Sequence, residues 1–270
     1  MSATFDLKAR LTEMGVVPKK AFGQNFLVSQ HVIGKIIEAV RSRTFKGMVE
    51  VGPGLGALTE PLLKVDLHPQ VIELDRDLAA YWQSRGLRVH EADALKFDWN
   101  TLQLQEPALL VSNLPYQIST SLVIDRCLGP LAIKYMVLMF QKEVAQRLTA
   151  SPSSKEYGML SVMAQLHFRI ARVADASPGD FFPAPKIASR VLLFERIEAQ
   201  GLGVPFLKFA KHAFQFRRKF LLKNLKSVMD KAKLETLTAG LTSMGLNEKA
   251  RAEELSPAQF RELFKKVYEH

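Results

Sequence analysis

The chain has 270 residues, of which 47% are apolar and 24% are charged, the proportions of an ordinary globular protein. Because a typical domain has about 150 residues, we expect one large domain and a smaller one. The sequence lacks the roughly 18 consecutive apolar residues that span a bilayer, and it lacks a secretory signal, so we expect a cytoplasmic monomer without membrane contact. Cys127 is the only cysteine and the six histidines lack ligand spacing, so we expect no disulfide and no metal site.

The net charge of +10 is concentrated in two segments. Residues 1–47 carry eight basic and three acidic side chains, and residues 205–233 carry nine basic and one acidic side chain. The chain between these segments is close to neutral. This distribution favours a polyanionic partner, with nucleic acid as the first candidate, over a basic surface that only aids solubility.

The middle of the chain alternates between short apolar runs and helical patterns. Strands are predicted over Met48–Val51, Gln70–Leu74, Leu87–Glu91, Ala108–Ser112 and Tyr135–Phe140. Helices are predicted over Ala57–Lys64, Arg76–Arg85, Thr120–Arg126 and Lys142–Ala150. This alternation is typical of βαβ units and of a mostly parallel sheet with helices on both faces, an α/β fold. Further along, 158–168 fits a helix or a strand, and 190–196 fits an edge strand.

A composition change near residue 200 marks a domain boundary. Gly201, Gly203 and Pro205 form the best candidate linker, and 206–233 shows helical spacing with interleaved lysine and arginine. Ser256 and the proline after it predict the start of a last helix, which runs to residue 268. We therefore predict a large domain over 1–200 with a basic arm over 1–47, and a small helical domain over 205–270.

A glycine-rich loop, Glu50-Val51-Gly52-Pro53-Gly54-Leu55-Gly56-Ala57, follows the first predicted strand and opens a helix. Glycines let a backbone turn tightly and approach a ligand closely. Glu73 ends the second strand, 21 residues after Gly52, where an acid binds the ribose of an adenosine ligand. The loop alone fits either a nicotinamide cofactor or S-adenosylmethionine.

Two further acids favour S-adenosylmethionine. Glu50 precedes the loop, where its carboxylate would repel a diphosphate and attract an ammonium and a sulfonium. Asp93 follows the third strand, where it can accept a hydrogen bond from an adenine amino group. Each acid alone is more simply a surface or capping residue. Three acids at successive strand ends beside a glycine loop favour a binding site.

The tetrapeptide Asn113-Leu114-Pro115-Tyr116 follows the fourth strand, where ligands bind in open parallel sheets. The Asn113 side chain offers an acceptor, Pro115 constrains Leu114 so that its carbonyl faces the crevice, and Tyr116 offers a flat apolar ring. These groups suit a planar base that carries an amino group. The competing interpretation is an Asn-initiated turn with a buried tyrosine.

Taken together, the motifs resemble the rRNA adenine N6-dimethyltransferases, most closely the small-subunit enzymes of the KsgA type. The matching segments, in the family's order over residues 18–195, are Phe22-Gly23-Gln24-Asn25-Phe26-Leu27, 50–56, 71–75, Asp93-Ala94, 113–119 and 181–186. The glycine loop is common to many methyltransferases, whereas the first block and Asn-Leu-Pro-Tyr are specific to this family. One departure is Gln117, which stands where many members have asparagine.

The resemblance implies a Rossmann-like, seven-stranded methyltransferase domain and a small all-α C-terminal domain. It implies dimethylation of two adjacent adenosines in a hairpin near the 3′ end of small-subunit rRNA, during ribosome biogenesis. The residues it implies for S-adenosylmethionine are Gln24, Asn25, Leu27, Glu50, Gly52, Gly54, Gly56, Glu73, Asp93, Ala94 and Asn113.

For the chemistry, we expect the Asn113 side chain and the Leu114 carbonyl to accept the N6 protons of adenine and to aim its lone pair at the methyl group. The target base must leave its stack, with Tyr116 on one face and Phe181, or else Phe182, on the other. The residues expected to hold rRNA phosphates are Lys19, Lys20, Lys208, Lys211, Arg217, Arg218, Lys219, Lys223 and Lys226.

Three other functions remain open at this point. A NAD-dependent dehydrogenase would account for the glycine loop and Glu73, but not for the Asn-Leu-Pro-Tyr turn or the basic helices. A non-catalytic ribosome-assembly factor would keep the fold without the reaction. A large-subunit rRNA methyltransferase that confers antibiotic resistance would share the chemistry and differ in its RNA.

Overall fold

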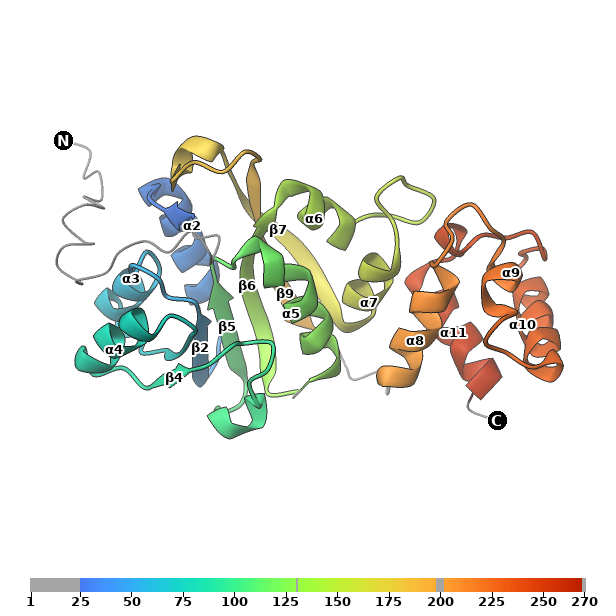
Figure 1. The fold of residues 1–270 in the computed structure, drawn as a ribbon, viewed down its shortest axis with the longest axis horizontal. Helices are drawn as coiled ribbons and strands as arrows, with labels where there is room; N and C mark the ends of the chain where they lie inside the picture. Colours follow the sequence, from blue (N-terminus) through green and yellow to red (C-terminus); the bar gives the residue numbers. More distant parts are fainter. Residues whose placement is uncertain (1–24, 130, 198–201, 269–270) are drawn as a thin grey trace. The chain divides into compact units, whose positions relative to one another are not determined.

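The computed structural model describes residues 25–129, 131–197 and 202–268 (Figure 1). Gln24, Lys19 and Lys20 lie outside the described residues. Within them the chain forms two compact units, one of 25–145 with 169–196, and one of 146–168 with 197 and 202–268. This division is not the linear split near residue 200 that the composition suggests, because 146–168 groups with the C-terminal helices.

The first unit contains a seven-stranded sheet with the strand order β4-β3-β2-β5-β6-β9-β7. Its strands are β2 (Gly47–Val51), β3 (Gln70–Glu73), β4 (Val89–Glu91), β5 (Ala108–Ser112), β6 (Ile133–Gln141), β7 (Phe168–Ala176) and β9 (Ser189–Arg196). The five strands from β2 to β6 pair in parallel, and β9 runs antiparallel to β6. The five strands predicted from apolar runs are therefore confirmed.

The edge of the sheet differs from the prediction. β9 lies between β6 and β7, so the expectation that 190–196 forms an edge strand was wrong. The edge strand is β7, most of whose residues are partly or fully exposed, including Arg169 and Arg172. An exposed strand of mixed polarity carries no apolar run, and this is why the sequence did not reveal it.

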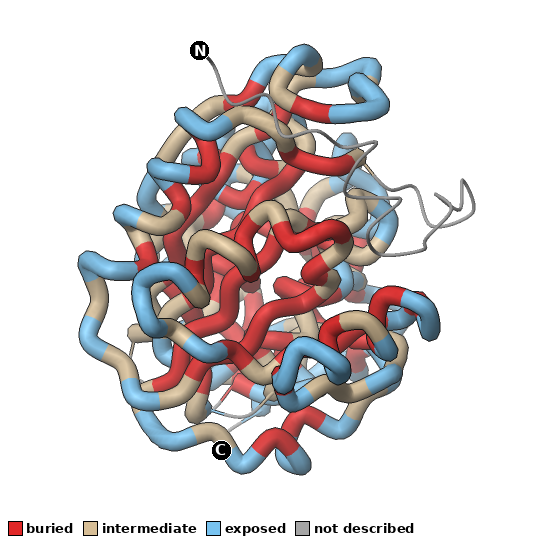
Figure 2. Tube along the Cα trace, turned by 90° about the vertical axis from the view of Figure 1, so that its left-hand side faces the viewer, coloured by how far each residue is buried: buried red, intermediate tan, exposed pale blue. Residues whose placement is uncertain are grey.

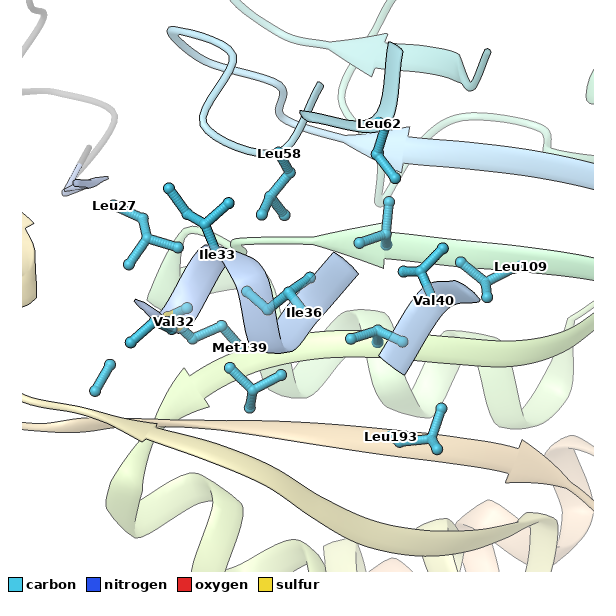
Figure 3. Packing of buried hydrophobic residues seen from close by; sticks show 14 of the residues in the cluster. Leu27, Val32, Ile33, Ile36, Val40, Leu58, Leu62, Leu109, Met139 and Leu193 are labelled. Atoms are coloured by element: carbon cyan, nitrogen blue, oxygen red, sulfur yellow. The ribbon is translucent and has the colours of Figure 1, made fainter. Parts of the chain in front are cut away.

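Helix α2 (Gln30–Arg41) corrects the expectation of a basic arm over 1–47. Its residues Val32, Ile33, Ile36 and Val40 recur every three to four positions and are buried. They pack against strand residues of the sheet, among them Leu109 and Met139 of β5 and β6, as Figure 3 shows. The segment from residue 26 onward is thus part of the core. Lys35 and Arg41 lie on the solvent-facing side of this amphipathic helix.

Four other helices complete the first unit. They are α3 (Thr59–Lys64), α4 (Arg76–Ser84), α5 (Tyr116–Leu128) and the start of α6 (Lys142–Leu148). In β5 and β6 the alternating residues of both faces are buried, so the central strands are covered on both sides. Figure 2 shows this as continuous buried segments through the sheet with exposed residues on the surrounding helices and loops.

A second core cluster packs α4 against β3 and centres on Trp82, which is fully buried. The indole nitrogen of Trp82 donates a hydrogen bond to the Gly54 carbonyl at 3.0 Å. Gly56 has φ +87°, and a Cβ at this position would lie 2.7 Å from the Trp82 ring. Gly56 therefore permits both a left-handed turn and the close approach of the tryptophan.

We expect Gly56→Ala to destabilise the first unit by about 3 kcal/mol, because it adds a steric overlap with Trp82 to the cost of the left-handed backbone. Gly86→Ala is the matched control, since Gly86 has φ +83° and no atom within 4 Å of an added Cβ. That variant should cost about 1 kcal/mol. Urea unfolding followed by tryptophan fluorescence measures both, and equal losses would contradict the packing role of Gly56.

The second unit is built from α7 (Met159–His167), α8 (Val204–Ala213), α9 (Leu221–Leu225), α10 (Lys231–Ser243) and α11 (Pro257–Tyr268). Its core is aromatic, with Phe206, Phe209, Phe260 and Phe264 in ring contact. The basic segment, in which the sequence shows one helical pattern, forms α8 and α9 joined by a turn over 214–220. Among the described residues, no helix is long and apolar enough to cross a membrane.

Candidate functional site

A cavity of about 270 Å³ lies where the glycine loop meets the carboxyl ends of the parallel strands of the first unit. Its wall comes from the residues that follow β2, β3, β4 and β5, together with 25–27. This is the position at which open parallel sheets bind ligands, because the loops there diverge and leave a crevice. The strand order therefore brings together motifs that lie up to about 90 residues apart in the sequence.

The glycine loop lines the cavity with left-handed backbone. Gly52 has φ +65° and Gly54 has φ +52°, conformations that side chains rarely adopt. The Gly52 amide donates to the Ile72 carbonyl at 2.9 Å, which ties the loop to β3. The loop is thus a fixed turn whose backbone is open to a ligand, since no atom lies within 4 Å of the position that a Gly52 Cβ would take.

Glu50 is the most buried acid in the cavity wall, with an exposed fraction of 1%. Burial raises the pKa of its carboxyl from 4.5 to about 8, and the nearby Glu73 carboxyl adds to this increase. The Thr59 hydroxyl donates a hydrogen bond to Glu50 Oε2 at 2.8 Å, which acts in the opposite direction. A buried carboxyl of this kind gains most when a cation enters the cavity.

Glu73 and Asp93 complete the acidic side of the cavity. Burial raises the pKa of Glu73, while the backbone amides of Asp75, at 2.9 Å, and Gly54, at 3.4 Å, donate to its carboxylate and limit the increase. Asp93 accepts a hydrogen bond from the Leu95 amide at 3.0 Å. No lysine or arginine belongs to the described residues that line the cavity. The wall therefore favours a cationic ligand and disfavours a diphosphate.

The Asn-Leu-Pro-Tyr turn also lines the cavity, after β5, which pairs with β2. The side-chain amide of Asn113 donates to the Asn25 carbonyl at 3.2 Å, so its Oδ1 is the atom left to accept a hydrogen bond from a ligand. Tyr116 begins α5, and its hydroxyl shares a hydrogen bond of 2.8 Å with the Ser189 hydroxyl. Burial raises the pKa of Tyr116, so the phenol stays neutral. The turn thus presents acceptors and an aromatic ring.

Most of the predicted site residues meet in this cavity. Those that line it are Asn25, Leu27, Glu50, Gly52, Gly54, Glu73, Asp93, Ala94, Asn113, Leu114, Pro115 and Tyr116. Gly56 does not line the cavity, and its place is the packing contact with Trp82 described above. Gln24 lies outside the described residues.

The position of Phe181 differs from the prediction that its ring stacks on the target base. It belongs to β8 (Phe181–Phe182), which pairs with β1 (Phe26–Leu27), and its partner in register is Leu27. Because successive strand residues point to opposite faces, Phe181 packs into the core with an exposed fraction of 4%, and Phe182 is 57% exposed. Phe181 is therefore packed in the core in this structure, neither phenylalanine is among the described residues that line the cavity, and a stacking role for Phe182 stays a prediction.

The cavity is also lined by residues that the sequence did not identify as site residues, and most of them are apolar. They are Phe26, Val51, Pro53, Leu55, Ala57, Leu58, Ile72, Leu74, Ala92, Gln117 and Ile118. Most are apolar residues that a sequence pattern cannot distinguish from core. Leu74 is the exception, because it is 52% exposed at the end of a buried strand, a position where a large apolar side chain needs a partner.

Apart from Lys19 and Lys20, which lie outside the described residues, the basic residues predicted to bind RNA lie in the second unit. Those exposed to solvent are Lys208, Lys211, Arg217, Arg218, Lys219, Lys223 and Lys226. Arg217 differs from the others because its guanidinium donates to the carbonyls of Ser154, Lys155 and Tyr157 and pairs with Glu253. The expectation that Arg217 holds a phosphate is therefore corrected, since its donors already hold the 154–157 loop.

We expect Arg217→Ala to destabilise the second unit by about 1–3 kcal/mol, because it leaves three carbonyls and one carboxylate without their donor. Arg218→Ala, at the adjacent exposed arginine, is the matched control. It should leave urea unfolding unchanged and weaken RNA binding. A stable Arg217→Ala variant with RNA affinity reduced as in Arg218→Ala would contradict this division.

The described residues contain no cluster of three or more histidine, cysteine, aspartate or glutamate side chains that could hold a metal ion. Cys127 is buried, and burial raises the pKa of its thiol to about 12, so it is not a nucleophile at neutral pH. The described residues of the cavity wall that carry functional groups are acids, amides and the Tyr116 ring.

The family match and the most similar relatives that we compared agree on one family of proteins. The sequence pattern of the family described as "Ribosomal RNA adenine dimethylase" matches residues 17–269. The chain is 51% identical over 255 residues to a ribosomal RNA small subunit methyltransferase A of Bdellovibrio bacteriovorus, covering 93% of each chain. It is 41% identical to a protein of the same name from Syntrophotalea carbinolica, covering 94% of this chain and 98% of the relative.

Solved structures share the fold. A dimethyladenosine transferase from Plasmodium falciparum superposes with a TM-score of 0.71 at 23% identity, over 88% of this chain and 95% of that one. The 23S rRNA methyltransferase ErmE superposes with a TM-score of 0.63 at 24% identity, over 90% and 99% of the two chains. The expected Rossmann-like methyltransferase sheet with a helical C-terminal region is thus confirmed.

Proposed function

The chain belongs to the ribosomal RNA adenine dimethylase family, whose methyltransferases dimethylate adenines of 16S-type rRNA, and on this premise we propose that its cavity holds S-adenosylmethionine. The substrate would be two adjacent adenosines in a hairpin near the 3′ end of small-subunit rRNA, each methylated twice at N6. The observation that carries the proposal is one cavity lined by three acids and by the Asn-Leu-Pro-Tyr turn.

The cavity wall fits this cofactor group by group. Glu50, without a cationic partner in the wall, suits the positive charges of the methionine part. The Glu73 carboxylate suits the ribose hydroxyls, and Asp93 suits the adenine amino group. The open left-handed backbone at Gly52 admits the ligand without a Cβ clash.

When bound, S-adenosylmethionine supplies an electrophilic methyl group on a sulfonium. The protein's task is then to position the amine, whose lone pair is delocalised into the adenine ring. Asn113 Oδ1 and the Leu114 carbonyl would accept hydrogen bonds from the N6 hydrogens, two in adenosine and one in the monomethylated product, and would hold the nitrogen with its lone pair directed at the methyl group. Each transfer replaces one N6–H bond by an N–CH3 bond, and the released proton leaves to solvent. Tyr116 supports one face of the base, and Phe182 covers the other.

The partner that fits the second unit is the rRNA of the small ribosomal subunit or its precursor. Exposed lysines and arginines on α8, α9 and the turn between them suit phosphates, which fix the position of an RNA without selecting its sequence. We infer that the protein acts in the cytoplasm, where ribosomal subunits are assembled, and that it works as a monomer.

The competing functions explain less of the molecule. A nicotinamide cofactor would place a diphosphate beside Glu50 and would leave the Asn-Leu-Pro-Tyr turn without a role. A large-subunit rRNA substrate is suggested by the likeness to ErmE, but at 24% identity that likeness concerns the fold. The relatives at 51% and 41% identity both carry the small-subunit name, which favours the small subunit.

Calorimetric titration tests the cofactor directly. We expect the protein to bind S-adenosylmethionine and to show no binding of NAD at the same concentrations. Asp93→Ala should weaken S-adenosylmethionine by about tenfold, the effect of one lost hydrogen bond to a charged group. Asp98→Ala, at an aspartate that does not line the cavity, should leave the affinity for S-adenosylmethionine unchanged. NAD binding more tightly than S-adenosylmethionine would overturn the proposal.

A further inference from the structure

The turn between α8 and α9 exposes an aromatic ring inside the most basic part of the chain. Phe216 is 49% exposed, whereas its neighbour Phe214 stacks on Phe260 at 5.3 Å between ring centres. Phe214 thus packs into the helical core, whereas about half of Phe216 faces water. Apolar ring surface that stays in water is costly, so the exposed part of Phe216 is a candidate contact.

The backbone of Phe216 is held in place by a buried side chain. Asn224, which is 3% exposed, donates from its side-chain amide to the carbonyls of Phe216 at 3.2 Å and Ala213 at 2.7 Å. The Lys219 amide also donates to the Phe216 carbonyl, at 2.9 Å. On the far side of Phe216, Arg217 is fixed by its carbonyl contacts. The ring is therefore presented by an ordered turn, which lowers the entropy cost of binding.

Cations surround this ring. The Lys219 ammonium lies 4.3 Å from the centre of the Phe216 ring, and Arg218 is exposed beside it. A second pair repeats the arrangement, with the Lys223 ammonium 5.5 Å from the ring centre of Phe220. Residues 205–229 include no acidic side chain. Because the Lys219 ammonium lies over one face of the Phe216 ring, a planar group would stack on the opposite face, with this positive charge close by.

An exposed aromatic ring among lysines and arginines is the arrangement that binds single-stranded nucleic acid. A free base stacks on the ring, and its phosphates contact the flanking cations. A duplex offers phosphates but keeps its bases stacked inside, so it would use the cations and leave the ring unused. An acidic peptide would use the charges, but it has no need of a flat ring beside them. Phe216 thus distinguishes an RNA with unpaired bases from the other polyanions.

We propose that Phe216 is a stacking platform for one unpaired base of the rRNA, with Lys219 and Arg218 contacting the phosphates on either side of that base. The second unit then recognises a single-stranded loop or bulge next to the methylated hairpin, rather than a duplex alone. The naming of the RNA as rRNA rests on the proposed function, whereas the stacking contact rests on the geometry of the turn.

The test compares two labelled RNA probes, an unpaired 12-nucleotide strand and the same strand in a duplex, over a range of salt concentrations. Phe216→Ala should weaken binding of the single strand by roughly 5- to 100-fold, without changing the slope of log affinity against log salt. Duplex binding should change less than about twofold. Phe216→Tyr, which keeps the ring, should retain affinity for the single strand.

Lys219→Ala is the matched control because it removes a charge from the same turn. It should weaken both probes and lower the salt slope by roughly 0.7 for the single strand. Phe216→Trp adds a direct readout, since Trp82 and Trp99 are both buried in the first unit and an exposed indole would be quenched by a stacked base. Equal loss of both probes in Phe216→Ala, or no loss in either, would overturn the proposal.

Titration with S-adenosylmethionine tests the proposed function separately. If the cofactor fails to bind while Phe216→Ala still weakens only the single strand, the stacking contact stands and the methyl-transfer function falls. If the cofactor binds and Phe216→Ala has no effect, the methyl-transfer function stands and the stacking contact falls. Urea unfolding of each variant checks that the second unit keeps its fold, as expected for a half-exposed residue.

Discussion

Asn113→Ala is expected to lower the rate of methyl transfer by about 100-fold or more, the effect of removing one preorganised hydrogen-bonding group at a reacting centre. The Asn113 amide donates to the Asn25 carbonyl, so its oxygen is held toward the ligand before any ligand arrives. Alanine removes that acceptor and leaves the neighbouring turn intact. Single-turnover kinetics with small ribosomal subunits measures the rate.

The affinity for S-adenosylmethionine should change much less than the rate, because Glu50, Glu73 and Asp93 remain. Asn100→Ala is the matched control, since Asn100 is an exposed asparagine outside the cavity whose side-chain amide donates to Asp98 in its own turn. It should leave both quantities unchanged. An Asn113→Ala enzyme that keeps a third or more of the wild-type rate would show that Asn113 does not position the amine.

Glu50→Gln is expected to stabilise the protein at high pH. The carboxyl has a pKa of about 8 in the folded protein, against 4.5 without burial. Between these values the folded protein holds a proton that the unfolded chain has lost, so stability falls as pH rises through this interval. The loss by pH 9 is on the order of 4 kcal/mol. Glutamine carries no charge at any pH and avoids this loss.

Urea unfolding at pH 5 and pH 9 measures the effect. Wild type and Glu50→Gln should be similar at pH 5, and the variant should be the more stable protein at pH 9. Glu91→Gln, on strand β4 where Glu91 is exposed, is the control and should show the same change in stability between pH 5 and pH 9 as the wild type. A wild-type protein that is as stable at pH 9 as at pH 5 would contradict the burial argument.

Glu50 also makes the affinity for S-adenosylmethionine depend on pH. A cationic ligand favours the ionised carboxylate of Glu50, so below pH 8 its binding must release the Glu50 proton. Wild-type affinity for S-adenosylmethionine should therefore rise from pH 6 to pH 8, by up to about tenfold per pH unit. In Glu50→Gln the affinity should be lower and should vary less with pH. The stability gained by glutamine thus comes at the expense of binding, as is common at functional sites.

Local patterns predicted much of this molecule. The five parallel strands are apolar runs bounded by turn residues, and Gly52, Gly54 and the acids at strand ends follow them at fixed positions. Because parallel strands share one carboxyl edge, strand prediction was enough to bring Glu50, Glu73, Asp93 and Asn113 to one cavity. The resemblance to the dimethyltransferases added the role of residues 25–27.

The rest depended on contacts that no local pattern contains. Phe181 and Phe182 are identical in type, and pairing with β1 alone decides which of them is buried. Arg217 and Arg218 are likewise adjacent and identical, but only Arg217 reaches the 154–157 loop, about 60 residues away in the sequence. The edge strand β7 lacks an apolar run that would reveal it in the sequence. The second unit includes 146–168, which no composition change separates from the first unit.

We expect this chain to dimethylate adenosines of small-subunit rRNA with S-adenosylmethionine held in the acid-lined cavity. The most direct test is incubation of purified protein and S-adenosylmethionine with small ribosomal subunits that lack the dimethyladenosine pair, followed by nucleoside mass spectrometry. We predict two N6,N6-dimethyladenosines per subunit, absent with Asn113→Ala. Failure to form this product while the cofactor binds, or its formation only on large subunits, would contradict the account.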